Sequence, residues 1–294
     1  IKPLIHTALF LLLISLAGAS YAQVPQIERD ALVALYNSTD GANWTDNTDW
    51  LGAAGTECSW FGVTCTNGSV SRLSFWKNGL NGTIPSELGN LSNLTYLHLG
   101  SNSLTGTIPS ELGNLTNLTT LRLDRNSLSG SIPAELGNLI NLTSLDLASN
   151  SLSGSIPVEL GNLTKLTQIF LFSNSLTGGI PFELGNLTKL SIFKISGNSI
   201  TGSLPDGIGS QSTNKISAIE RSVLVALYNS TDGANWTDNI GWMGAVGTEC
   251  FWFGITCSSG SVSTIVLYGN SLSGSIPSEL GNLSNLTYLH LGSN

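Results

Sequence analysis

Ionisable and aromatic side chains recur in this sequence at intervals of 24 residues. His98, Arg122, Asp146, Phe170 and Lys194 form one such series. Residues at a fixed interval in a repeating fold lie side by side on one face, so the series predicts a surface that combines imidazole, guanidinium, carboxylate and aromatic groups. Such groups can hydrogen-bond and stack against a partner, and Trp, Tyr and Arg carry much of the binding energy of protein interfaces.

Neighbouring series extend this candidate binding surface. A first cluster gathers aromatic and charged residues: Arg72, Trp76, Lys77, Tyr96, His98, Arg122, Asp124 and Arg125. Phe170 and Phe172 form a second cluster, and Asp146 and Lys194 complete the candidate set. Aromatic rings flanked by polar groups suit protein partners and also sugar stacking. The alternative interpretation is ordinary surface variation on a scaffold that tolerates it.

These residue types do not form a catalytic set. No histidine stands at a recognisable spacing from a nucleophile, and a column of glutamates (Glu87, Glu111, Glu135, Glu159 and Glu183) fits a scaffold role at the start of a helical turn. Asx turns explain the Asp- and Asn-rich segment 37–47 better than a calcium loop does. We therefore expect a binding protein and not an enzyme, with no cofactor and no metal.

The candidate residues occupy variable positions of a 24-residue repeat, LxxLxLxxNxLxGxIPxELGNLxN. Its asparagine recurs as Asn78, Asn102, Asn126, Asn150, Asn174 and Asn198. The LxL core predicts a short strand, stacked in parallel on its neighbours about 4.8 Å apart. The ELGNL segment predicts a helical turn. We expect each repeat asparagine to hydrogen-bond backbone groups of its own and adjoining coils, because these groups would otherwise be buried without partners.

The LxGxIP block resembles the plant-type leucine-rich repeat of receptor kinases and polygalacturonase-inhibiting proteins. That family also carries an N-terminal cap with a C-x-W-x-G-V-x-C signature, which stands here from Cys58 to Cys65. The resemblance implies an α/β solenoid, a right-handed superhelix with a parallel concave β-sheet and helical, disulfide-bonded caps. It is specific for fold and weak for function, because this fold serves many binding roles.

A second copy of the cap lies inside the chain. Residues 220–257 repeat residues 28–65 with 30 of 38 positions identical. We expect a cap at 23–69, six repeats at 70–213, a second cap at 214–261 and the start of a second array at 262–294. A boundary near Ser210 to Asn214 would give two tandem solenoids. One continuous solenoid and an artefact of sequence assembly are the alternatives.

The cysteines and the first residues indicate export. Cys58 with Cys65, and Cys250 with Cys257, predict two local disulfides, with zinc binding as the weaker alternative. Residues 1–22 combine Lys2, an apolar run and small residues before Gln23, which is typical of a signal peptide; an uncleaved anchor is the alternative. Because the sequence starts at Ile1 and stops at Asn294 within a repeat, we expect a piece of a longer protein.

The composition limits the classes of partner that the chain can bind. Charged residues make up 10% of the chain and the net charge is −8. An acidic chain without a basic run argues against nucleic acids and anionic membranes, and no later segment is apolar enough to span a membrane. We expect a recognition module, secreted or at the cell surface, that binds a protein, peptide or polysaccharide on its concave face. Sequons such as Asn93-Leu94-Thr95 would allow glycosylation in a host that performs it.

The alternative function is structural: a surface adhesin, or a regular-surface binder of the ice-binding type. A hydroxyl column motivates it, with Thr83, Thr107, Ser131 and Ser155 recurring once per coil. Long Thr-x-Thr arrays are lacking, which disfavours this function.

Overall fold

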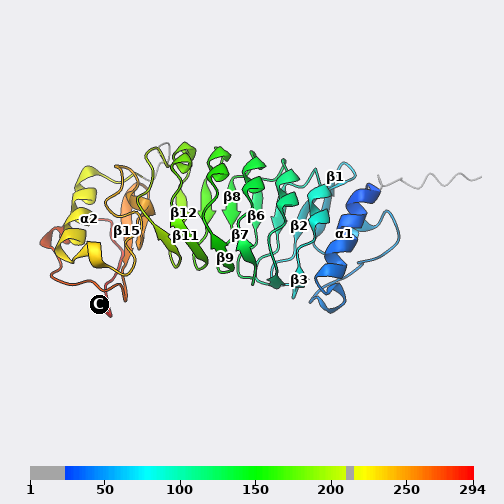
Figure 1. Ribbon diagram of the computed structural model, residues 1–294, viewed down its shortest axis with the longest axis horizontal. Coiled ribbons are helices and arrows are strands. Elements are labelled where there is room, and N and C mark those ends of the chain that lie inside the picture. Colours follow the sequence, from blue (N-terminus) through cyan, green and yellow to red (C-terminus); the bar gives the residue numbers. More distant parts are fainter. Residues whose placement is uncertain (1–23, 210–214) are drawn as a thin grey trace, which may run out of the picture.

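The computed structural model describes residues 24–209 and 215–294. The predicted signal peptide and the predicted boundary at Ser210 to Asn214 lie outside these described residues. Figure 1 shows an elongated stack of coils, with helix α1 (Gln26–Ser38) at one end and helix α2 (Ala218–Ser230) near the other. Each coil contributes one short strand to a long face of the stack, as the repeat predicts.

This long face is a seven-stranded sheet, which we call the concave face. The first strand pairs antiparallel with the second and the others run parallel, so that Leu73, Leu97 and Leu121 lie in register. The expected fold class is confirmed. The strands in spatial order are β1 (Val63–Thr66), β2 (Ser69–Ser74), β4 (Tyr96–His98), β6 (Thr120–Arg122), β8 (Ser144–Asp146), β10 (Gln168–Phe170) and β12 (Ile192–Lys194).

The return path of each coil holds a second set of parallel strands, which the sequence analysis did not predict. Their outward residues are mostly serine and threonine, and a glycine with positive φ, such as Gly106 at 74°, lies within the return path of each coil. They are β3 (Asn81–Thr83) paired with β5 (Ser103–Thr105), and β7 (Ser129–Ser131), β9 (Ser151–Gly154), β11 (Ser175–Gly179) and β13 (Ser199–Thr201) in one sheet.

The predicted helical turns are confirmed as short 3-10 helices that follow the repeat prolines. Proline fits at the start of a helix, where its missing N–H is not needed. The turns are η3 (Ser86–Asn90), η4 (Ser110–Asn114), η5 (Ala134–Asn138), η6 (Val158–Asn162) and η7 (Phe182–Asn186). Their buried leucines close the core from the side opposite the concave face.

Each repeat asparagine ties neighbouring coils together, as the sequence predicts. The Asn126 amide donates to the carbonyls of Leu99 (3.0 Å), Leu123 (3.0 Å) and Asp124 (3.2 Å). Its oxygen accepts from the backbone N–H of Leu104 at 3.0 Å. One side chain thus satisfies polar backbone groups of two coils that water cannot reach.

Replacing this asparagine tests the role of the ladder. Asn126→Ala leaves several buried backbone groups unpaired, so we expect the free energy of unfolding to fall by about 2–4 kcal/mol. Asn117→Ala is the control, because the exposed Asn117 side chain donates one bond, to Ser92 O. Urea denaturation followed by circular dichroism measures both. Equal losses in the two variants would contradict the prediction.

Both caps have the expected helix and disulfide. In the first cap the Glu28 carboxylate accepts the backbone N–H of Val70, and the Cys58–Cys65 disulfide links the 3-10 turn at 57–59 to strand β1. In the second cap Cys250–Cys257 makes the equivalent link. The remaining elements are η1 (Gly41–Asn43), η2 (Glu57–Ser59), η8 (Gly233–Asn235), η9 (Glu249–Phe251), β14 (Ile255–Ser258), β15 (Ser261–Val266), η10 (Ser278–Asn282) and β16 (Tyr288–His290).

The second cap packs against the sixth coil, and one hydrophobic core runs through both arrays. Phe251 is buried there, and a Cβ added to Gly209 would lie 2.6 Å from its Cζ. A Cβ added to Gly241 would lie 2.8 Å from Cδ1 of Leu204. We call this junction the seam. Three of the eight differences between the caps lie there. The second cap has Ile240, Gly241 and Phe251 where the first cap has the exposed Thr48, Asp49 and Ser59.

The domain limits stay predictions, and limited proteolysis tests whether the arrays form one body. If they do, the wild-type chain resists cleavage at 205–218. Phe251→Ser, which restores the residue of the first cap, should make cleavage at 205–218 faster, because losing a buried phenylalanine costs about 3–5 kcal/mol of packing at the seam. Val246→Ala is the matched control, since it also restores a first-cap residue but at an exposed site. Rapid wild-type cleavage at 205–218 would instead favour two independent solenoids.

Candidate functional site

A groove of about 430 Å³ lies on the concave face over strands β4, β6 and β8. The parallel register aligns His98, Arg122 and Asp146 across these strands. The turn that follows each strand supplies the rest of the lining. The described residues that line the groove are Trp76, His98, Arg122, Asp124, Arg125, Asp146, Ala148, Ser149 and Phe172.

Phe172 joins the two clusters that the sequence analysis kept apart. It lines the same groove as Trp76 and Arg122, and it is half-buried. Ala148 and Ser149 also line the groove and were not among the candidates. Their position 24 residues after Asp124 and Arg125 was the available signal, but their side chains have little chemistry of their own.

Arg72 and Tyr96 form an ordered pair beside the groove. The guanidinium carbon of Arg72 lies 3.4 Å from the centre of the Tyr96 ring, which is a close cation–π contact. The Tyr96 hydroxyl lies 3.3 Å from Nδ1 of His98. When the hydroxyl donates this bond, Nε2 of His98 carries the ring proton and points its N–H elsewhere.

Two buried polar atoms in the groove have no hydrogen-bond partner within the described part of the chain. They are Nε2 of His98 and Oδ1 of Asp124, on side chains that are each 8% exposed. A Cβ added to Gly100 would lie 3.0 Å from the first and 2.4 Å from the second. Glycine at position 100 therefore lets these two side chains lie against the backbone of the turn, because a side chain there would collide with them. Buried polar atoms without a partner can accept or donate a further hydrogen bond when a ligand supplies it.

Burial sets the charge state of the groove. Desolvation, reinforced by the Arg122 guanidinium, lowers the pKa of His98, so its imidazole is neutral at pH 7. Desolvation and the Asp124 carboxylate raise the pKa of Asp146. Arg122 lies 3.5 Å from the Asp146 carboxylate, and Arg125 adds a second cation. The groove thus offers neutral, anionic and cationic groups close together.

Besides Arg72 and Tyr96, three predicted site residues lie outside this groove. Lys77 is exposed in the turn after β2, and Phe170 is half-buried between Asp146 and Lys194 in its column. Lys194 is covered by the second cap, where its Nζ donates to the carbonyl of Ile255 at 3.1 Å. Among the described residues, no cluster of His, Cys, Asp and Glu could hold a metal ion. None of the helices within 24–209 and 215–294 has the length and apolar character of a membrane span.

A capped solenoid of leucine-rich coils with a groove on its parallel sheet defines the class of this molecule. The chain belongs to the leucine-rich repeat family: the family's leucine-rich repeat region matches residues 73–237, and a single leucine-rich repeat matches residues 261–283. Receptor-like protein 36 of Arabidopsis thaliana is 39% identical over 74 residues, which are 24% of this chain and 9% of that protein. The resemblance to plant receptor proteins is confirmed.

Solved structures show the same fold. The structure of PEPR1–AtPEP1 matches 91% of this chain and 42% of its own, with 27% identity and a TM-score of 0.67. The ectodomain of the Arabidopsis thaliana receptor kinase GASSHO1/SCHENGEN3 was solved in complex with CASPARIAN STRIP INTEGRITY FACTOR 2. The match covers 91% of this chain and 29% of that ectodomain, with 29% sequence identity and a TM-score of 0.58. The match to a plant ice-binding protein covers 62% of this chain and 59% of that protein, with 33% sequence identity and a TM-score of 0.56.

Proposed function

We propose that this chain is an extracellular recognition module that binds a peptide, or an extended segment of a protein, in the groove of the concave face. The observation that carries the proposal is the pair of buried, unpartnered polar atoms on His98 and Asp124. Leaving such atoms unpaired costs free energy, which a ligand hydrogen bond recovers. The GASSHO1/SCHENGEN3 ectodomain, which is similar to this chain, was solved in complex with CASPARIAN STRIP INTEGRITY FACTOR 2, and this similarity supports a binding function.

The groove residues contribute different kinds of contact to the ligand. His98 and Asp124, which both line the groove, offer their unpartnered polar atoms to a ligand group. Arg122 and Arg125 supply cations for a carboxylate, whereas Trp76, which is 55% exposed, and Phe172 supply apolar contact. Both charge signs beside aromatic rings suit a peptide better than a neutral polysaccharide, because a peptide presents charged and apolar side chains together.

Peptides selected from a random displayed library against the wild-type chain test this function. In calorimetry with a selected synthetic peptide, we expect Trp76→Ala and Arg122→Ala to weaken binding by about 30-fold or more, the effect of losing an interface hot spot. Lys165→Ala is the matched control, because Lys165 is exposed and bonds Asn141 away from the groove. Circular dichroism checks each fold. Selected peptides that bind both groove variants as tightly as wild type would refute the site.

The second candidate function is binding to a regular lattice such as ice. The strands of the return path favour it, because their register sets exposed hydroxyls side by side, as in Thr83 with Thr105 and Ser131 with Ser153. Neighbouring strands repeat this hydroxyl surface about every 4.8 Å. The similarity to a plant ice-binding protein points the same way.

Thermal hysteresis of the purified chain separates the two functions. A lattice binder shows a freezing gap that falls strongly in Thr105→Lys, because a long charged side chain prevents close approach of the flat hydroxyl surface. Trp76→Ala should leave the gap unchanged, since Trp76 lines the groove of the concave face and not the return path. No measurable hysteresis in the wild-type chain would exclude this candidate and leave the peptide-binding proposal intact.

A further inference from the structure

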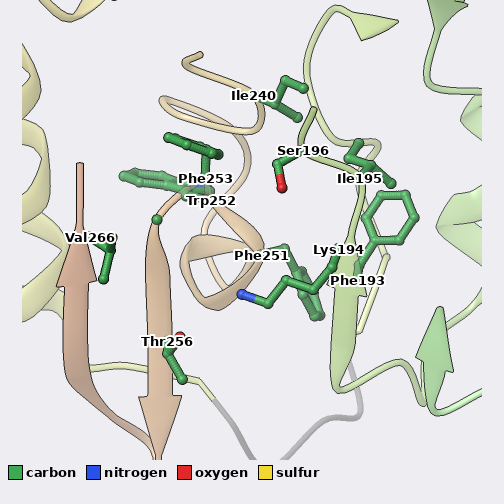
Figure 2. Close-up of a pocket in the computed structure, with 11 residues that line it drawn as sticks. Phe193, Lys194, Ile195, Ser196, Ile240, Phe251, Trp252, Phe253, Thr256 and Val266 are labelled. Atoms are coloured by element: carbon green, nitrogen blue, oxygen red, sulfur yellow. The ribbon is translucent and has the colours of Figure 1, made fainter. Parts of the chain in front are cut away.

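A second pocket, separate from the groove, lies at the seam between β12 and the second cap. Its volume is about 270 Å³. Figure 2 shows Lys194 extending from β12 toward the cap, with Phe253 and Trp252 on the cap side and Ser196 above. Ile240 and Phe251 complete the apolar wall. An apolar enclosure with few polar groups is the usual form of a small-molecule site.

Lys194 is the one charged residue among the described residues that line this pocket. Its Nζ donates to the carbonyl of Ile255, which satisfies one of the three donors of an ammonium group. No carboxylate in the described chain forms an ion pair with it. Burial lowers the pKa of Lys194, and no neighbouring carboxylate offsets this effect. The cation is therefore partly desolvated and lacks a counter-ion.

Two residues of the apolar wall, Ile240 and Phe251, have no apolar counterpart in the first cap. At the positions of Ile240 and Phe251 the first cap has Thr48 and Ser59, both exposed. Docking against the sixth coil accounts for the burial of Phe251, but it does not account for a cation beside the wall. A seam built only for packing would favour an apolar residue at position 194, since burying an unpaired charge is costly.

We propose that the seam pocket binds a small organic acid with an apolar body, whose carboxylate pairs with Lys194. The carboxylate supplies the missing counter-ion, and a charge-assisted hydrogen bond in a partly desolvated site is stronger than one in water. The apolar body lies against Phe251, Trp252 and Phe253. The pocket volume suits a compact acid of about ten non-hydrogen atoms.

Phenylacetate tests the proposal, with phenylacetamide as the uncharged counterpart of nearly the same shape. In calorimetric titration of the full chain, we expect the acid to bind at least about tenfold more tightly than the amide. Lys194→Met should abolish this preference, whereas Lys194→Arg, which keeps the charge, should retain it. Lys165→Met is the matched control, since it removes an exposed lysine elsewhere and should change nothing.

The remaining outcomes separate this pocket from the groove and from loss of fold. Trp76→Ala should leave phenylacetate binding unchanged, so this inference stands or falls independently of peptide binding. Protease resistance at the seam shows whether the cap stays docked in Lys194→Met. If the cap does not stay docked in this variant, the proposal is judged from the Lys194→Arg result and from the acid-to-amide ratio of the wild type. Equal binding of acid and amide, no saturable acid binding, or loss of acid binding in Trp76→Ala would overturn the proposal.

Discussion

The hydrogen bonds of the repeat asparagines are the constraint on which this molecule depends. Each coil must turn sharply after its strand, and the turn buries carbonyl groups that no backbone N–H of the same coil can reach. Asn102 bonds the carbonyls of Phe75, Leu99 and Gly100, and so joins each coil to the one before it. A change in coil length would break these bonds, because buried polar groups rarely stay unpaired. The fixed interval of 24 residues follows from this geometry.

The same interval builds the groove. Because every coil is held in register, a side chain can be changed in one column without disturbing the leucines beneath it. His98 and Asp124 lie in neighbouring coils, and their proximity requires the absence of a side chain at Gly100. The scaffold thus tolerates two unpaired polar atoms here, since their cost is small beside the stability of a continuous core. Regularity in the backbone allows irregular chemistry on one face.

The sequence predicts what is periodic and fails where the period is interrupted. Asparagine, leucine and proline columns predict the strands, the turns and the core, because each has one physical role per coil. The strands of the return path escaped prediction, since their Ser-Gly-Ser segments have low strand propensity and form only because stacking places them side by side. Phe172 reaches the groove through the shape of its turn. Lys194 is covered by the second cap, and the carbonyl it bonds, that of Ile255, lies 61 residues later in the sequence. Neither relation is encoded by the interval of 24.

The two caps show how one segment serves two environments. The first cap presents Thr48, Asp49 and Ser59 to water, and the second presents Ile240, Gly241 and Phe251 to another coil. The two caps share one buried hydrogen bond: in each, a buried glutamate accepts a backbone N–H of the first parallel strand of its sheet, β2 or β15. Core residues that fold the cap are therefore separable from surface residues that decide whether it ends a solenoid or continues one. A cap that continues a solenoid must bury a protein surface on both sides, and the apolar residues at the seam meet that requirement, whereas Lys194 does not.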